Sequence, residues 1–125
     1  MGEIADDVVN VDRAMRWGFG WGLGPFETWD AIGIEKSVQR MEREGKPVPP
    51  AVQAVLDGGR GGFYDRGDDG ARRFFDLGET SPLPIPVAPD QVVLSDRKAQ
   101  GFEILRNWSA SLLDIGDGVG CVEFH

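Results

Sequence analysis

Residues 11–33 read VDRAMRWGFGWGLGPFETWDAIG, and this stretch decides the fold of the first part of the chain. It begins within an apolar stripe whose spacing matches one helix face and which consists of Ile4, Val8, Val11 and Met15. The alternating glycines from Gly18 to Gly24 then end the helix, and we expect a buried loop whose backbone passes close to another element. Pro25 suits the first position of a following helix, and Glu27 suits its first turn. The stretch therefore predicts two helices joined by a glycine bend.

Further helices are expected after the bend. Apolar residues from Ile34 to Met41 repeat with helical spacing, and Gly45 is placed to end that helix. Pro49 and Pro50 open a shorter helix, which the paired glycines at 58 and 59 close. The first sixty residues therefore predict four short helices.

The middle and the end of the chain have a different character. Two short aromatic runs flank the turn-rich residues 66–70, which predicts a β-hairpin. Four prolines in residues 81–89 predict an extended, polyproline-like linker; a proline-binding domain could use it as a ligand, but such runs more often span a surface. Residues 109–115 and 119–124 flank the glycine-bounded turn at 116–118, a strong hairpin signal. Because the second strand ends at the last residue, we expect a truncated chain whose sheet continues elsewhere.

The charge of the chain excludes several partners. Its 125 residues carry a formal net charge of −8 at pH 7, which repels anionic membranes and predicts no nucleic-acid partner. No apolar run is long enough to span a bilayer, so we expect no membrane span. Cys121, the single cysteine, cannot form a disulfide within the chain and is interpreted as a small apolar strand residue. No signal-peptide pattern is present, so we expect a cytoplasmic protein.

Two segments carry a resemblance to a known family. Residues 11–20 and 24–33 match the pattern Ile/Val-Asp-x-Ala-Met, a glycine-rich bend, and Gly-Pro-Phe-Glu followed by Asp and Gly at fixed spacing. The chain therefore resembles the C-terminal helical domain of 3-hydroxyacyl-CoA dehydrogenases. The resemblance implies a mainly α fold, with a short helical bundle of the 6-phosphogluconate-dehydrogenase C-terminal-like type followed by an irregular Pro-rich linker and β-hairpins.

A second resemblance lies at the other end of the chain. Residues 110–125, ASLLDIGDGVGCVEFH, look like the opening hairpin of an enoyl-CoA hydratase, or crotonase-type, domain. This order resembles bifunctional bacterial proteins in which the dehydrogenase precedes the hydratase. The implied organisation has a helical dehydrogenase module at 1–60, a hairpin at 61–80, a Pro-rich linker at 81–101, and the truncated opening hairpin of a crotonase-type domain at 102–125.

The same resemblance implies that both active sites lie outside this chain. The family's dehydrogenase binds NAD in a Rossmann domain and uses a His–Glu pair, with a Ser and an Asn that hold the substrate oxygen. The chain contains no strand–GxGxxG–helix unit, and Asn10 does not occupy the place of the family's Asn. His125, the single histidine, lies at the terminus, and we expect no structure around it to tune or orient it; the hydratase's glutamates and oxyanion hole would follow it. We therefore expect no catalytic, cofactor-binding or metal-binding residue in this fragment, and NAD in the parent protein.

Apolar residues of the bend are the candidate substrate-binding residues. They would form a wall for a fatty acyl chain, and they are Phe19, Trp21, Pro25 and Phe26. The alternative, which we favour, is a packed core that joins the two helices, because aromatic residues beside helix starts usually pack.

Charged residues near the bend also have two interpretations. Glu27 and Asp30 lie three residues apart and could form an acid–base pair, but solvated surface or helix capping is the stronger interpretation. Asp12 and Arg16 have the spacing of an ion pair on one helix. Six arginines could hold CoA phosphates, although in a chain of this charge we expect them to be spread among carboxylates. They are Arg13, Arg16, Arg40, Arg43, Arg72 and Arg73.

Two functional hypotheses follow. In the first, the parent is a fatty-acid β-oxidation enzyme that oxidises 3-hydroxyacyl-CoA to 3-oxoacyl-CoA with NAD. This piece is then a helical domain, inactive alone, that encloses the acyl chain and contacts another domain or subunit. Its implied partners are the acyl-CoA substrate, the Rossmann and crotonase domains of the same chain and, as an option, a second copy in a homodimer. In the second hypothesis, the chain is a free-standing protein-interaction module that acts through its Pro-rich segment or its terminal edge strand.

Overall fold

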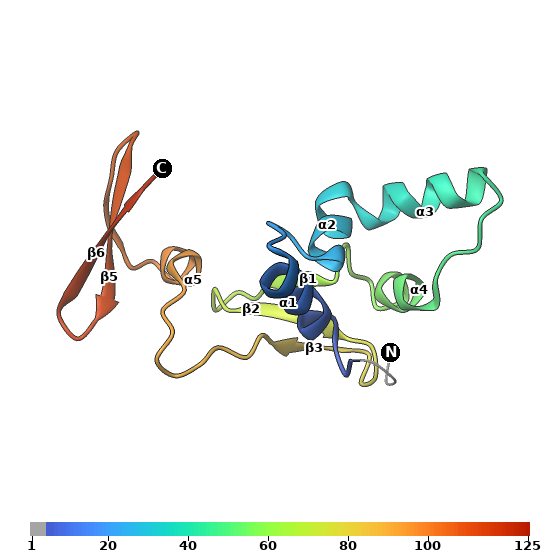
Figure 1. Cartoon of the computed structure of the whole chain (residues 1–125), viewed down its shortest axis with the longest axis horizontal. Coiled ribbons are helices and arrows are strands. Elements are labelled where there is room, and N and C mark those ends of the chain that lie inside the picture. The colour runs from blue at the N-terminus through green and yellow to red at the C-terminus, as the bar shows by residue number, and fades with distance from the viewer. Residues whose placement is uncertain (1–4) are drawn as a thin grey trace. The chain divides into compact units, whose positions relative to one another are not determined.

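The structure, a computed structural model, describes residues 5–125, which divide into two compact units (Figure 1). The N-terminal unit comprises residues 5–65 and 73–85, and the C-terminal unit comprises residues 66–72 and 86–125. The first of two three-stranded sheets lies mainly in the N-terminal unit, and the second lies in the C-terminal unit. Each unit is described separately below.

Within the described residues, the N-terminal unit contains the four predicted helices: α1 at Val8–Phe19, α2 at Pro25–Ile32, α3 at Ile34–Arg43 and α4 at Pro50–Asp57. Asp7 caps α1 by accepting the N–H of Asn10 at 2.7 Å, and Gly20 ends it in the left-handed conformation, with φ of 68°. Proline starts both α2 and α4, where its missing N–H costs nothing. Ile4, the first residue of the predicted apolar stripe, lies outside the described residues.

The first sheet consists of β1 (Tyr64–Arg66), β2 (Arg72–Asp76) and β3 (Ser81–Pro84), in the order β1-β2-β3. β1 and β2 form the predicted hairpin, whereas β3 lies in the segment predicted to be an irregular linker. β3 pairs antiparallel with β2, and Phe75 lies opposite Pro82. The N–H of Phe75 bonds to the carbonyl of Phe63, on the side away from β3, at 2.8 Å. Phe75 and Pro82 therefore form a pair in which β2 requires no N–H from residue 82. The missing N–H of proline is tolerated because β3 is an edge strand.

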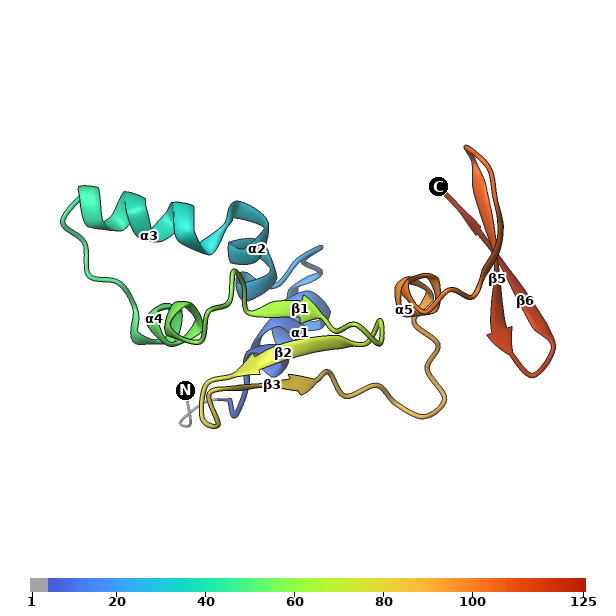
Figure 2. The ribbon, with the colours of Figure 1, turned by 180° about the vertical axis from the view of Figure 1, so that it is seen from behind.

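One buried cluster stabilises the N-terminal unit. In Figures 1 and 2, α1 lies over the sheet, and its Val8 and Val9 belong to the same buried cluster as Phe74 and Phe75 of β2. The other buried members come from α3, α4 and the residue before β1: Ile34, Val38, Val52, Val55 and Phe63. Each such side chain contributes about 1.5–3 kcal/mol relative to an exposed one. Packing, more than helix propensity, therefore supports helices this short.

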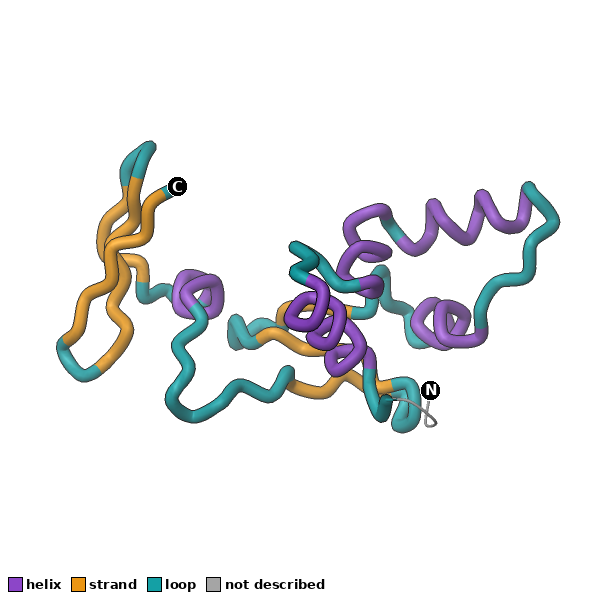
Figure 3. The backbone as a smooth tube through the Cα atoms, viewed as in Figure 1, coloured by secondary structure: helices purple, strands orange, loops and turns teal. Residues whose placement is uncertain are grey.

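The C-terminal unit contains helix α5 (Leu94–Ala99) and the sheet of β4 (Glu103–Arg106), β5 (Ala110–Gly116) and β6 (Val119–Phe124), in the order β4-β5-β6 (Figure 3). β5 and β6 form the predicted terminal hairpin. Asp117 and Gly118 in its turn have φ of 53° and 73°, as a tight hairpin turn requires. β4 pairs with the other side of β5 and was not predicted. Ser111 and Leu113 of β5 are buried.

The expected mainly α fold is wrong. The described residues form five helices and two three-stranded antiparallel sheets, with 36% helix and 24% strand, which is an α+β composition. Residues 81–84 and 103–106 became strands because β2 and β5 offer them backbone partners, and a local pattern of side chains does not reveal such pairing. The short helical bundle with an irregular linker is therefore replaced by two sheets with associated helices. The proposed division of the chain at residues 60, 80 and 101 stays a prediction.

Candidate functional site

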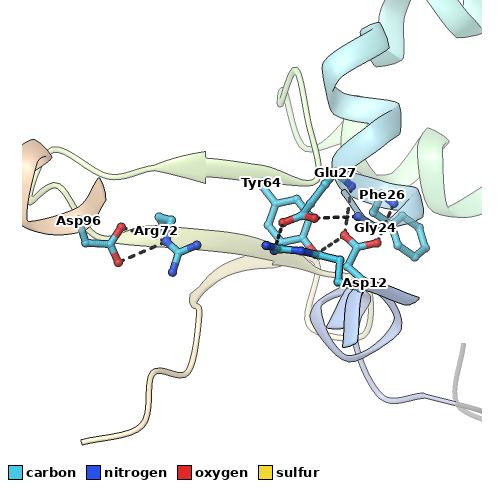
Figure 4. Close-up of polar contacts among 8 residues, drawn as sticks. Asp12, Gly24, Phe26, Glu27, Tyr64, Arg72 and Asp96 are labelled. Carbon is cyan, nitrogen blue, oxygen red and sulfur yellow. Dashed lines mark hydrogen bonds and ion pairs between the residues drawn. The ribbon is translucent and has the colours of Figure 1, made fainter. Parts of the chain in front are cut away.

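The matched sequence pattern builds a polar junction between α1 and α2, with Asp12 at its centre (Figure 4). Asp12 lies in α1 and is only 2% exposed. Its Oδ1 accepts the N–H of Phe26 at 2.9 Å, and its Oδ2 accepts the N–H of Glu27 at 3.1 Å. The hydroxyl of Tyr64 donates to the same Oδ2 at 2.7 Å. Asp12 thus caps α2 from a different helix, and its negative charge faces the positive end of the α2 dipole.

Position 24 must be glycine because the junction leaves no room for a side chain there. It is the N-cap residue of α2 and has no side chain with which to cap the helix. A Cβ at this position would lie 2.3 Å from both Cβ and Oδ1 of Asp12, far inside van der Waals contact. Its φ of −75° is ordinary, so the close approach of Asp12 is what selects glycine. The expected close backbone passage therefore occurs at Gly24, which is buried. The expected burial of the whole loop is wrong, because residues 18–23 are exposed.

Glu27 completes the capping of α2. Its Oε2 accepts the N–H of Gly24 at 2.8 Å, and its Oε1 contacts Nη1 of Arg16 at 3.0 Å. The predicted pairing of Arg16 with Asp12 is therefore replaced by a pairing with Glu27. Arg16 and Glu27 are 42% and 24% exposed, so this ion pair is worth little by itself, and the backbone bond positions the helix.

Asp30, one turn further along α2, holds the strand that follows α4. Its two carboxylate oxygens accept the N–H groups of Phe63 and Tyr64, each at 2.8 Å. A Cβ at Gly62 would lie 3.0 Å from this carboxylate, so glycine again gives the close approach. Burial raises the pKa of Asp30, while the two backbone N–H groups act in the opposite direction. Asp30 thus connects α2 to β1.

The phenol of Tyr64 remains a neutral donor over a wide pH range. Burial raises its pKa well above the usual range, and the hydrogen bond to the Asp12 carboxylate raises it further. Each carboxylate oxygen of Asp12, Glu27 and Asp30 accepts a bond from an N–H or O–H group. This geometry serves capping and positioning, and it supports that interpretation of Glu27 and Asp30 over an acid–base pair. In the sequence, Asp12 is marked only by its position in the family pattern Ile/Val-Asp-x-Ala-Met.

The candidate acyl-wall residues differ in how far they are exposed. Phe19 is 73% exposed and Trp21 is 49% exposed. Pro25 and Phe26 are half-buried, and the Phe26 ring lies 4.8 Å from the Phe63 ring in an edge-to-face arrangement. Phe26 therefore packs against the core. That all four residues line an acyl channel stays a prediction.

The arginines considered for phosphate binding make several different contacts. Arg13 stacks 5.5 Å from the Trp17 ring, and Arg40 pairs with Glu44 at 2.8 Å. Arg43 and Arg40 border a surface cavity of about 400 Å³ together with Glu44. In the C-terminal unit, Nε of Arg72 pairs with Asp96 at 2.9 Å (Figure 4). Arg16, Arg40 and Arg72 thus pair with carboxylates, whereas Nε of Arg43 donates to the carbonyl of Gln39 at 3.3 Å.

His125 has structural neighbours that the sequence analysis did not foresee. Its Nε2 lies 3.0 Å from Oγ of Ser111, and that hydroxyl donates to Glu103 at 2.6 Å. In a nucleophilic triad the carboxylate is hydrogen-bonded to the histidine. Here the carboxylate of Glu103 instead accepts the hydrogen bond of the serine hydroxyl. Ser111 is also only 1% exposed. This row of side chains therefore crosslinks the three strands of the second sheet.

Two further features are absent from the described residues. No group of three or more His, Cys, Asp or Glu side chains there could hold a metal ion. No helix among them combines the length and the apolar character that crossing a bilayer requires.

Comparison with known proteins connects the whole chain to a dehydrogenase sequence. All 125 residues align at 41% identity with part of one curated protein, as expected for a fragment of such an enzyme. That relative is named "Probable 3-hydroxyacyl-CoA dehydrogenase" and comes from Bacillus subtilis (strain 168). The resemblance to a 3-hydroxyacyl-CoA dehydrogenase that was inferred from the sequence is thereby confirmed, whereas the resemblance of residues 110–125 to a crotonase-type domain stays a prediction. The chain spans 16% of the length of this relative. No family model matches the chain, and no solved structure matches it.

Proposed function

We propose that this chain is a non-catalytic segment of a fatty-acid β-oxidation enzyme that oxidises 3-hydroxyacyl-CoA to 3-oxoacyl-CoA with NAD. The observation that carries the proposal is the 41% identity over all 125 residues to a 3-hydroxyacyl-CoA dehydrogenase. The junction geometry supports the non-catalytic part, because the carboxylates of Asp12, Glu27 and Asp30 are occupied by backbone and side-chain donors.

NAD is placed outside this segment. Dinucleotides bind at the carboxyl ends of parallel strands, where a glycine-rich turn leads into a helix. The described residues form two antiparallel sheets, and their sequence has no GxGxxG turn after a strand. A Rossmann domain elsewhere in the parent protein would supply that site. A crotonase-type hydratase domain after this segment is a further part of the proposal, supported by the sequence pattern at 110–125.

The segment's own role would be enclosure and contact. Enclosing an acyl chain excludes water and positions the substrate, which accelerates a reaction without a proton-transferring group in the enclosing wall. Phe19 and Trp21 are available for such a role because they are exposed, whereas Phe26 already packs on Phe63. The hydrogen bonds of Asp12 and Asp30 would hold α1 and α2, the helices on either side of the proposed acyl-chain wall, at a fixed angle.

The proposal is tested by comparing two proteins for NADH production from 3-hydroxyacyl-CoA substrates. We expect none from the 125-residue chain and turnover from the longer protein encoded by the surrounding reading frame. Turnover by the short chain would contradict the placement of the active site. A surrounding frame without a nucleotide-binding domain would contradict the proposal as a whole.

An interaction module remains the second candidate, favoured by one observation in the C-terminal unit. β6 is an edge strand, and its Val122 and Phe124 are 55% and 81% exposed. An exposed apolar edge can take up a strand from a partner. Light scattering distinguishes the candidates: association of the 125-residue chain that disappears when the chain is shortened to end at Leu94 would favour the module.

A further inference from the structure

We draw no further inference here: the strongest candidate, the apolar face that Leu105, Leu112 and Val122 form across the three strands of the second sheet, carries none because nothing in the described part of the structure shows what covers it.

Discussion

Asp12 shows how one buried carboxylate can organise two helices and a strand. It accepts bonds from two backbone N–H groups of α2 and from the Tyr64 hydroxyl, and it is 2% exposed. A buried charge is costly unless each of its oxygens is bonded, and bonds to charged groups are worth about 1.5–3 kcal/mol each. Removing any one donor should therefore destabilise the junction more than the loss of a surface contact would.

Tyr64→Phe removes one donor and leaves the ring in place. We expect the free energy of unfolding to fall by about 1–3 kcal/mol, because Oδ2 of Asp12 loses its shortest bond while remaining buried. Urea denaturation followed by far-UV circular dichroism measures the change. An unchanged midpoint would show that water or another group replaces the phenol at no cost.

The pH dependence of Tyr64 gives a second test of the same bond. Its pKa in the folded chain is raised above the unfolded value of about 10, so its stabilising contribution is complete below that pH and is lost as the pH rises further. Tyr64 is the single tyrosine, so tyrosinate absorbance reports on it alone. We expect no tyrosinate in the folded chain at a pH where the urea-unfolded chain is half-ionised. Coincident titration curves would contradict the buried contact with Asp12.

Gly24→Ala tests the close approach at the junction. The new Cβ would lie 2.3 Å from Asp12, so α1 and α2 must separate and the caps must weaken. We expect a loss of about 2 kcal/mol or more in the free energy of unfolding. Gly22→Ala is the matched control, because its Cβ meets nothing within 4 Å, and it should leave the stability of the 125-residue chain nearly unchanged. Equal effects of the two substitutions would argue against a specific contact with Asp12.

At the scale of elements, the loop at residues 66–72 depends on helix α5 within the C-terminal unit. Asp96 of α5 contacts Nη1 of Arg66 and Nε of Arg72, each at 2.9 Å, on either side of the loop. Arg66 also donates to the carbonyl of Gly70. One carboxylate therefore holds both ends of the loop.

Asp96→Asn removes the charge that both arginines share. We expect amide hydrogen exchange at Gly67 and Gly70, whose N–H groups bond within the loop, to become about tenfold faster. Asp90→Asn, in the same unit, is the matched control and should leave these rates unchanged. Exchange rates unaffected by either substitution would show that the backbone bonds alone order the loop.

Four of the five helices in the described residues could be predicted from the sequence because their signals are local, whereas α5 lies in the segment predicted to be a linker. Proline starts, glycine ends and apolar spacing located four helices, and the turn at Asp117 and Gly118 located the last hairpin. β3 and β4 were missed because their pairing with β2 and β5 decides their conformation, and the prolines of β3 argued for a linker. The site was predicted only in part. Asp12 looked like a helix-surface partner of Arg16, and nothing local indicated that it would reach α2 and Tyr64.

At the scale of the molecule, the two units differ in how much they bury. Among its described residues, the N-terminal unit has a cluster of nine buried apolar residues, two each from α1, α3, α4 and β2, together with Phe63. In the second sheet, Leu105, Leu112 and Val122 lie side by side across the three strands, and Leu105 and Val122 are 67% and 55% exposed. Exposed apolar side chains that lie side by side often mark a surface that contacts another part of a protein. Within a longer protein, as proposed, that row would be expected to find further contacts.

The central claim is that the matched pattern positions helices and carries out no chemistry. It is tested most directly by measuring kcat of the longer protein with Glu27→Gln and Asp30→Asn introduced separately, alongside the unfolding midpoint of each variant. General acid–base groups contribute about 10²–10⁴ to a rate, whereas a capping carboxylate contributes to stability. We predict lower midpoints with kcat per folded molecule within about twofold of the parent value. A loss of a hundredfold or more in kcat at an unchanged midpoint, about the least that removal of a general acid or base produces, would contradict the account.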